Sequence, residues 1–83
     1  MYTNIVIEMV QGIRERYLDK KFRDKAWSEV ASAPVSAING VSEGDGVYLQ
    51  RAFNIKTIQD LAENKFVRVA QTIISLAEIE KRV

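Results

Sequence analysis

The chain has 83 residues, with 12 lysines and arginines against 11 aspartates and glutamates, and a formal net charge of +1. This length indicates a single domain, residues 1–83, near the lower limit of what one hydrophobic core stabilises. Cysteine and histidine are absent from the sequence, which excludes disulfides and thiolate zinc sites and removes the commonest general base. We therefore expect no metal site, no cofactor and no catalytic residue, and we class the protein as non-enzymatic.

The first predicted element is a helix from Thr3 to Leu18, in which apolar residues recur at helical spacing. Its β-branched run Ile5-Val6-Ile7 could instead begin a strand, but no partner strand follows in the sequence. The run is also too short to span a membrane and lacks the flanks of a signal peptide. We therefore expect a cytoplasmic protein with no membrane contact.

The next predicted helix covers residues 19–33 and is ended by Pro34, because a residue before proline disfavours the helical conformation. Whether residues 17–21 form a turn or continue one long helix stays open, although Asp19 as a cap favours two helices. Helical spacing favours core positions over base stacking for three aromatic residues of this region. They are Tyr17, Phe22 and Trp27.

After Pro34 the sequence predicts one helical turn at residues 35–38, followed by a turn at Asn39-Gly40. Ser42 is a good N-cap for a helix over residues 43–53, with Asp45 three residues later as in a capping box. These signals predict a tight hairpin between helical segments.

Thr57 and Asp60 repeat the capping pattern for a short helix, and Asn64 can end that helix and cap the last one. The last helix is expected from Lys65 to about Lys81. Its apolar arc is wider than a surface helix needs, so it lies at the centre of the core or is partly covered by a second chain. The arc consists of Phe66, Val67, Val69, Ala70, Ile73, Ile74, Leu76 and Ala77.

Charge is unevenly distributed along the chain. Residues 14–25 hold six cations and three anions, whereas acidic residues predominate over residues 42–64. A solvated helix face is the simplest interpretation of the basic stretch, but it also supplies candidates for phosphate contacts. These candidates are Arg14, Arg16, Lys20, Lys21, Arg23 and Lys25.

The stretch Ile38-Asn39-Gly40-Val41-Ser42-Glu43-Gly44-Asp45-Gly46-Val47-Tyr48-Leu49 resembles the helix-hairpin-helix motif, and residues 53–62 are similar to the segment that follows it. The resemblance covers about residues 34–77. It implies an all-α fold: a compact bundle of about five helices with a helix-hairpin-helix-like core and SAM-like orthogonal packing. Residues 1–33 would form an N-terminal helical segment beside residues 34–83. Members of this family commonly bind the DNA backbone through N–H groups of the hairpin.

The chain departs from the motif at Ser42, which replaces the second hairpin glycine and is followed by Glu43 and Asp45. Because two carboxylates would repel a phosphate, we expect the hairpin residues to be structural. These residues are Gly40, Ser42, Gly46 and Thr57. The sequence thus predicts a protein-interaction or scaffold module that binds a protein partner or a second copy. The alternative is non-sequence-specific DNA binding through the hairpin and the basic stretch.

Overall fold

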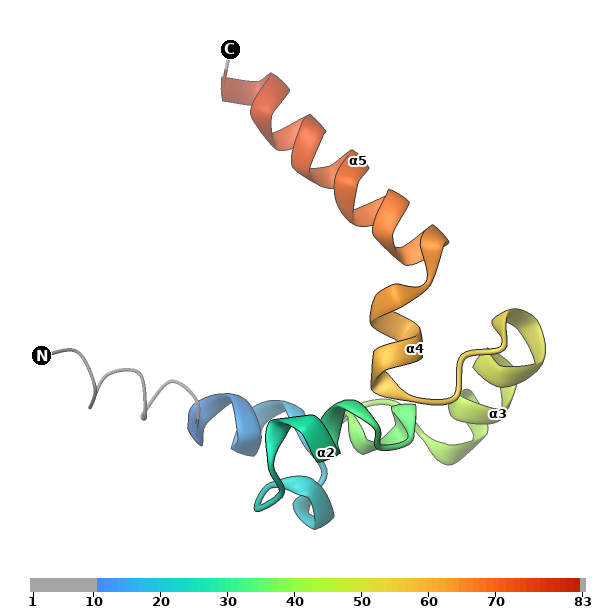
Figure 1. Ribbon diagram of the computed structural model, residues 1–83. Coiled ribbons are helices and arrows are strands. Elements are labelled where there is room, and N and C mark those ends of the chain that lie inside the picture. Colours follow the sequence, from blue (N-terminus) through green and yellow to red (C-terminus); the bar gives the residue numbers. More distant parts are fainter. Residues whose placement is uncertain (1–10, 83) are drawn as a thin grey trace, which may run out of the picture.

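The computed structural model describes residues 11–82, which are almost entirely helical (Figure 1). Residues 11–17 are helical, and six labelled elements follow. They are the 3-10 turn η1 (Lys20–Phe22), α2 (Trp27–Ala31), the 3-10 turn η2 (Val35–Ala37), α3 (Glu43–Phe53), α4 (Ile58–Glu63) and α5 (Lys65–Arg82). Within these residues no strand forms, so the predicted all-α class and its five helices are confirmed. The prediction for residues 3–10, helix or strand, lies outside the described residues.

The helix boundaries after Pro34 follow the capping signals of the sequence. The Ser42 hydroxyl accepts the backbone N–H of Asp45 at 3.0 Å, and the Asp45 carboxylate accepts the N–H of Ser42 at 3.0 Å. Thr57 and Asp60 form the same reciprocal pair at the start of α4. Asn64 Oδ1 accepts the N–H groups of the first turn of α5 at 2.9 and 3.2 Å. The predicted caps are therefore confirmed.

A central strap, residues 33–39, holds the rest of the chain together through its backbone. On one side it pairs with residues 17–19, where Asp19 N donates to Ala37 O and Asn39 N donates to Tyr17 O, both at 2.8 Å. On the other side it pairs with residues 56–58 through two more bonds at 3.0 and 3.1 Å. The strap thus joins three segments that are distant in sequence.

The buried core lies along this strap and consists mostly of valine and alanine side chains. Its members are Leu18, Val30, Ala33, Val35, Ala37 and Ile55. Gly40 takes a φ of +97° in the turn before α3, a conformation that other residues rarely adopt, which fits its expected structural role. A Cβ built at Gly46 would lie 3.5 Å from the Val35 side chain, an ordinary van der Waals contact, so the approach of α3 to the strap does not require glycine at that position.

The single helix expected over residues 19–33 is wrong, although the predicted break after the first helix is confirmed. The segment consists of η1, an irregular turn and the short α2. The Arg14 guanidinium explains the interruption, since it donates to the carbonyls of Arg23 at 2.9 Å and Lys25 at 2.7 Å. Those carbonyls are thereby satisfied without a continuing helix. Two aromatic residues expected in the core are exposed instead, Tyr17 and Trp27.

The compact bundle expected from the sequence is not what residues 11–82 form. The radius of gyration is 15.4 Å, against about 12 Å for a compact chain of this length. The excess comes from α5, which follows α4 and then extends away from the other helices to the C-terminal end (Figure 1). The expectation that this helix lies at the centre of the core is therefore wrong.

Candidate interaction surface

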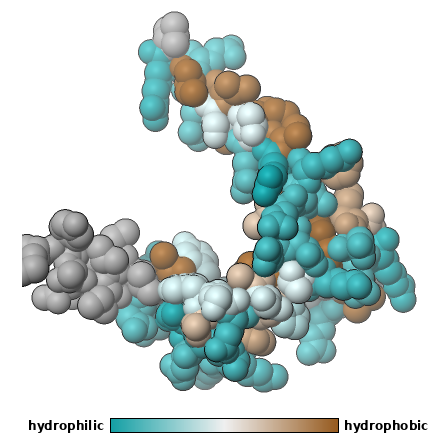
Figure 2. Space-filling model, viewed as in Figure 1, coloured by the Kyte–Doolittle hydropathy of each residue, from teal (hydrophilic) through white to brown (hydrophobic). Residues whose placement is uncertain are grey.

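The most prominent surface feature is an apolar stripe on α5, made of Phe66, Val69, Ile73 and Leu76. These residues alternate spacings of three and four, so they align along one side of the helix. Each is 55–59% exposed, and every residue from 68 to 82 is exposed. Figure 2 shows the hydrophobic colour running along this helix. We call this set the α5 stripe; Ile74 and Ile79 flank it and are equally exposed.

The α5 stripe is anchored to the rest of the molecule at its first residue. The rings of Phe66 and Phe53 have centroids 6.1 Å apart and planes inclined by 59°. This tilted arrangement is one that aromatic pairs favour. The contact fixes the base of α5 beside the end of α3, while the remaining turns of the helix stay clear of the core.

Beyond Phe53, the apolar surface continues onto α3 as a shallow hollow of about 350 Å³. It is lined by Val41, Asp45, Tyr48, Leu49, Ala52 and Phe53. Tyr48 is 69% exposed, the largest exposure among the apolar and aromatic residues of the described chain. The α5 stripe and this α3 hollow therefore form one continuous apolar surface that bends where the two helices meet.

The hairpin, the other candidate site, has two of its N–H donors occupied by the chain itself. The N–H of Ser42 is bonded to the Asp45 carboxylate and that of Asp45 to the Ser42 hydroxyl. The N–H of Ser42, then its hydroxyl, lower the pKa of Asp45 below its usual value, so this carboxylate is charged at neutral pH. A phosphate approaching the hairpin would meet a negative charge and few free donors.

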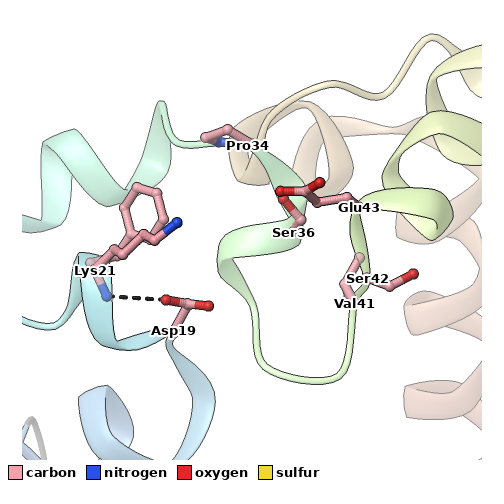
Figure 3. Close-up of a pocket in the computed structure, with 8 residues that line it drawn as sticks. Asp19, Lys21, Pro34, Ser36, Val41, Ser42 and Glu43 are labelled. Atoms are coloured by element: carbon pink, nitrogen blue, oxygen red, sulfur yellow. Dashed lines mark hydrogen bonds between the residues drawn. The ribbon is translucent and has the colours of Figure 1, made fainter.

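Beside the hairpin lies an open hollow of about 390 Å³ (Figure 3). Its walls come from η1, the strap and the start of α3, and Asp19 and Glu43 stand on opposite sides of it. The Asp19 carboxylate accepts the backbone N–H of Lys21 at 3.1 Å. Because two carboxylates and one lysine line it, this hollow does not favour an anion. No group of three or more potential metal ligands occurs among residues 11–82.

The six basic residues proposed for phosphate contacts do not form one free set. Arg14 is held by the carbonyls of Arg23 and Lys25, and its guanidinium lies 4.0 Å from the centre of the Trp27 ring. Arg23 donates from Nε to the carbonyl of Leu18 at 3.0 Å. The other four remain exposed, namely Arg16, Lys20, Lys21 and Lys25. Two of the six candidates are thus engaged in holding the N-terminal segments together.

Sequence reasoning found the wide arc of α5 but missed its continuity with α3. Phe53 and Phe66 are separated by α4, and no periodicity within one helix relates two residues on different helices. One feature of the sequence does favour the contact between these two rings: Phe53 is at the end of one predicted helix and Phe66 is at the start of another. Such residues meet when the intervening helix is short.

Comparison of the chain with protein-family models, with curated proteins and with solved structures finds no match. Among the described residues, no helix has both the length and the apolar character needed to cross a bilayer.

Proposed function

We propose that this protein is a small non-enzymatic interaction module that binds another protein chain through the α5 stripe. The observation that carries the proposal is the exposure of six large apolar side chains on one helix. They are Phe66, Val69, Ile73, Ile74, Leu76 and Ile79, each 55–60% exposed. With on the order of 100 Å² exposed by each residue, the four residues of the stripe give roughly 400 Å², and Ile74 and Ile79 extend the apolar surface around the helix on either side. Contiguous apolar patches of this size mark interaction sites on soluble proteins.

The stability of α5 also supports binding to another chain. An isolated helix of 18 residues is marginal in water, because most helical stability in proteins comes from packing of an apolar face. Beyond its first turn, α5 has no such packing within the described chain. Covering about half of each of six side chains would contribute about 1 kcal/mol per residue. A partner would therefore stabilise this helix as it binds.

For the hairpin we propose a structural role within a helix-hairpin-helix-like arrangement of residues 34–62. Gly40 supplies the positive φ of the turn, Gly46 lies where α3 faces Val35, and Ser42 and Thr57 supply the two helix caps. The Asp45 carboxylate occupies the place where a bound phosphate would accept hydrogen bonds. The hairpin thus orients α3, and with it the α3 hollow.

Nucleic-acid binding is the second candidate, favoured by four exposed basic residues, which are Arg16, Lys20, Lys21 and Lys25. Non-specific binding through these residues would weaken steeply with salt. Fluorescence anisotropy with labelled duplex and single-stranded DNA, at low and physiological salt, tests it. We expect no binding at either concentration; salt-sensitive binding that is lost on changing Lys20 and Lys21 to glutamate would favour this second function.

The main experiment compares Ile73→Asp with Ser75→Asp, which places the same charge on the opposite side of the same helix. Light scattering and urea unfolding are measured across protein concentrations for both variants and the unchanged chain. We expect association of the unchanged chain to be lost in Ile73→Asp and kept in Ser75→Asp. The proposal fails if the chain is monomeric at all concentrations and Ile73→Asp alone destabilises that monomer by more than about 2 kcal/mol. That result would mean that the chain buries the stripe in its own fold.

A further inference from the structure

We infer that the partner of the α5 stripe is a second copy of this chain, with the two α5 helices packed antiparallel and crossing near Ile73. This inference rests on the proposed function and names its partner and geometry. Three observations support it: the register of the stripe, the position of the charges at its ends, and the area it offers.

The register is that of a helix pair. Phe66, Val69, Ile73 and Leu76 occupy the alternating three- and four-residue spacing at which two helices interlock side chains. Ala70 and Ala77 lie beside them, and their small size permits close approach of a neighbouring helix. Because the same three- and four-residue spacing continues along the whole stripe, the stripe can pack against a second copy of itself. A two-fold interface requires such a self-complementary surface.

The charges distinguish the two directions of packing. Glu80 comes four residues after Leu76 and so continues the stripe at its C-terminal end. In a parallel pair, Glu80 would face the Glu80 of the second copy, and two like charges would be brought together at the edge of an apolar contact. In an antiparallel pair, Glu80 instead approaches the start of the other α5, where Lys65 and Arg68 lie. Lys81 and Arg82, the basic residues of the last turn, come to the same end, but they lie off the stripe, because they follow Leu76 by five and six residues. The antiparallel direction thus replaces the repulsion between the two Glu80 side chains with attraction.

The first turn of α5 lacks an acidic residue and contains Lys65. Negative charge near a helix N-terminus is stabilising, because it interacts favourably with the helix dipole. An approaching Glu80 from a second copy would supply that charge. The end of the second α5 would then pass Phe66 and lie beside the α3 hollow, so that both parts of the apolar surface are covered.

The area of the stripe and the α3 hollow together matches a specific pair of small size. Roughly 400 Å² from the four stripe residues of each copy gives about 800 Å² in total, and covering the α3 hollow as well brings the interface towards the roughly 1,200 Å² at the lower end of the range for stable interfaces. A reversible dimer of moderate affinity is the expected consequence, because association costs about 4–15 kcal/mol before any net binding appears.

Charge exchange tests the direction. We expect Glu80→Lys to weaken dimerisation by about 3- to 10-fold, since it removes an attraction and creates a repulsion. The combined variant Lys65→Glu, Arg68→Glu and Glu80→Lys should recover the affinity of the unchanged chain. In a parallel dimer each residue faces its own copy, so Glu80→Lys would change little and would overturn the inference. Sedimentation or light scattering over a dilution series provides the dissociation constants.

A distance measurement tests the same geometry without altering the stripe. Because the chain has no cysteine, single spin labels can be placed at Ser75→Cys and Arg82→Cys. In an antiparallel pair crossing near Ile73, the two copies of residue 82 lie on the order of 25 Å further apart along the helix axis than a pair at the crossing point. The distance between labels at 82 should therefore clearly exceed that at 75. Equal distances at the two positions would show a parallel pair and overturn the inference.

These outcomes separate the inference from the proposed function. If the chain forms a parallel dimer and Ile73→Asp dissociates it, the antiparallel inference is wrong and the proposed function is still supported. If the chain is a monomer and Ile73→Asp does not change its stability, the antiparallel inference is also wrong. The stripe is then still available to bind a different protein. A monomer that Ile73→Asp destabilises would overturn both.

Discussion

The segment around the strap and the helix α5 differ in where their large apolar residues lie. Around residues 33–39, backbone hydrogen bonds join three distant segments, and the buried side chains are mostly valine and alanine. On α5 the larger isoleucine, leucine and phenylalanine side chains are exposed along one side. The part of the chain that folds on itself thus buries mostly small residues, and the large apolar residues of α5 remain exposed.

This division means that folding and binding can be disturbed separately. A change in the strap region should reduce the stability of a single copy, because the buried residues have no other support. A change on the α5 stripe should reduce association and leave the single copy nearly unaffected. The four experiments below compare the two regions in this way.

The largest change in unfolding free energy is expected for Leu18→Ala, and Ile73→Ala is the variant to compare with it. Leu18 is 5% exposed and packs against the strap, so its truncation should cost about 2–4 kcal/mol of unfolding free energy. Ile73 is 57% exposed, and its truncation should cost less than about 1 kcal/mol in the monomer while weakening association. Urea unfolding at a concentration below the dimerisation range measures both. Equal losses in the two variants would contradict the division between the regions.

Sequence reasoning succeeded where structure depends on neighbours in the chain. The caps Ser42 and Thr57, the turn at Gly40 and the bounds of α3 are local, because a side chain reaches only N–H groups two or three residues away. The sequence did not reveal the break at residues 23–26, since it depends on the Arg14 guanidinium reaching carbonyls nine and eleven residues further along.

The strap could not be predicted for a related reason. Its hydrogen bonds join residues 33–39 to residues near 18 and 57, and these bonds use backbone groups that every residue carries. For α5, the width of the apolar arc could be read from the sequence, but this pattern is compatible with two different positions of the helix. A helix buried in its own core and a helix exposed for a partner both require many apolar residues.

The next largest loss of stability is expected on removing the contact between residues 11–17 and the turn that joins η1 to α2. Arg14→Ala removes two hydrogen bonds to the carbonyls of Arg23 and Lys25 and the contact with the Trp27 ring. We expect a loss of about 1–3 kcal/mol, since hydrogen bonds to charged groups are stronger than neutral ones. The chain has one tryptophan, so its fluorescence reports the lost contact directly.

Arg16→Ala is the matched control for this experiment, because Arg16 carries the same charge and is exposed on the same helix. Its stability and tryptophan emission should stay close to those of the unchanged chain. Identical losses in the two variants would mean that charge in the basic stretch, rather than the specific contacts of Arg14, determines stability.

A smaller effect is expected at the two helix caps. Ser42→Ala and Thr57→Ala each remove a hydroxyl that accepts an N–H at 3.0 Å, and each should cost about 1 kcal/mol. Changing Ser75 to alanine, whose hydroxyl bonds a carbonyl within α5, is the control and should cost much less. Urea midpoints provide the comparison. A cap variant that left stability unchanged would show that the hairpin does not depend on the capping box.

The smallest effect is the response of the monomer to acid, and it should arise from the capping carboxylates of α3 and α4. Backbone N–H bonds, from Ser42 in one case and from Lys56 and Thr57 in the other, lower the pKa values of Asp45 and Asp60. A carboxylate with a lowered pKa stabilises the fold fully above its unfolded value of about 4, and this contribution is lost as pH falls through the lowered value. Stability should therefore decline below about pH 4. The double variant Asp45→Asn, Asp60→Asn should be less stable at neutral pH and should decline less on acidification. If it declined as steeply as the unchanged chain, carboxylates outside the two caps would have to carry the response, and the acid sensitivity would no longer distinguish the strap region from α5.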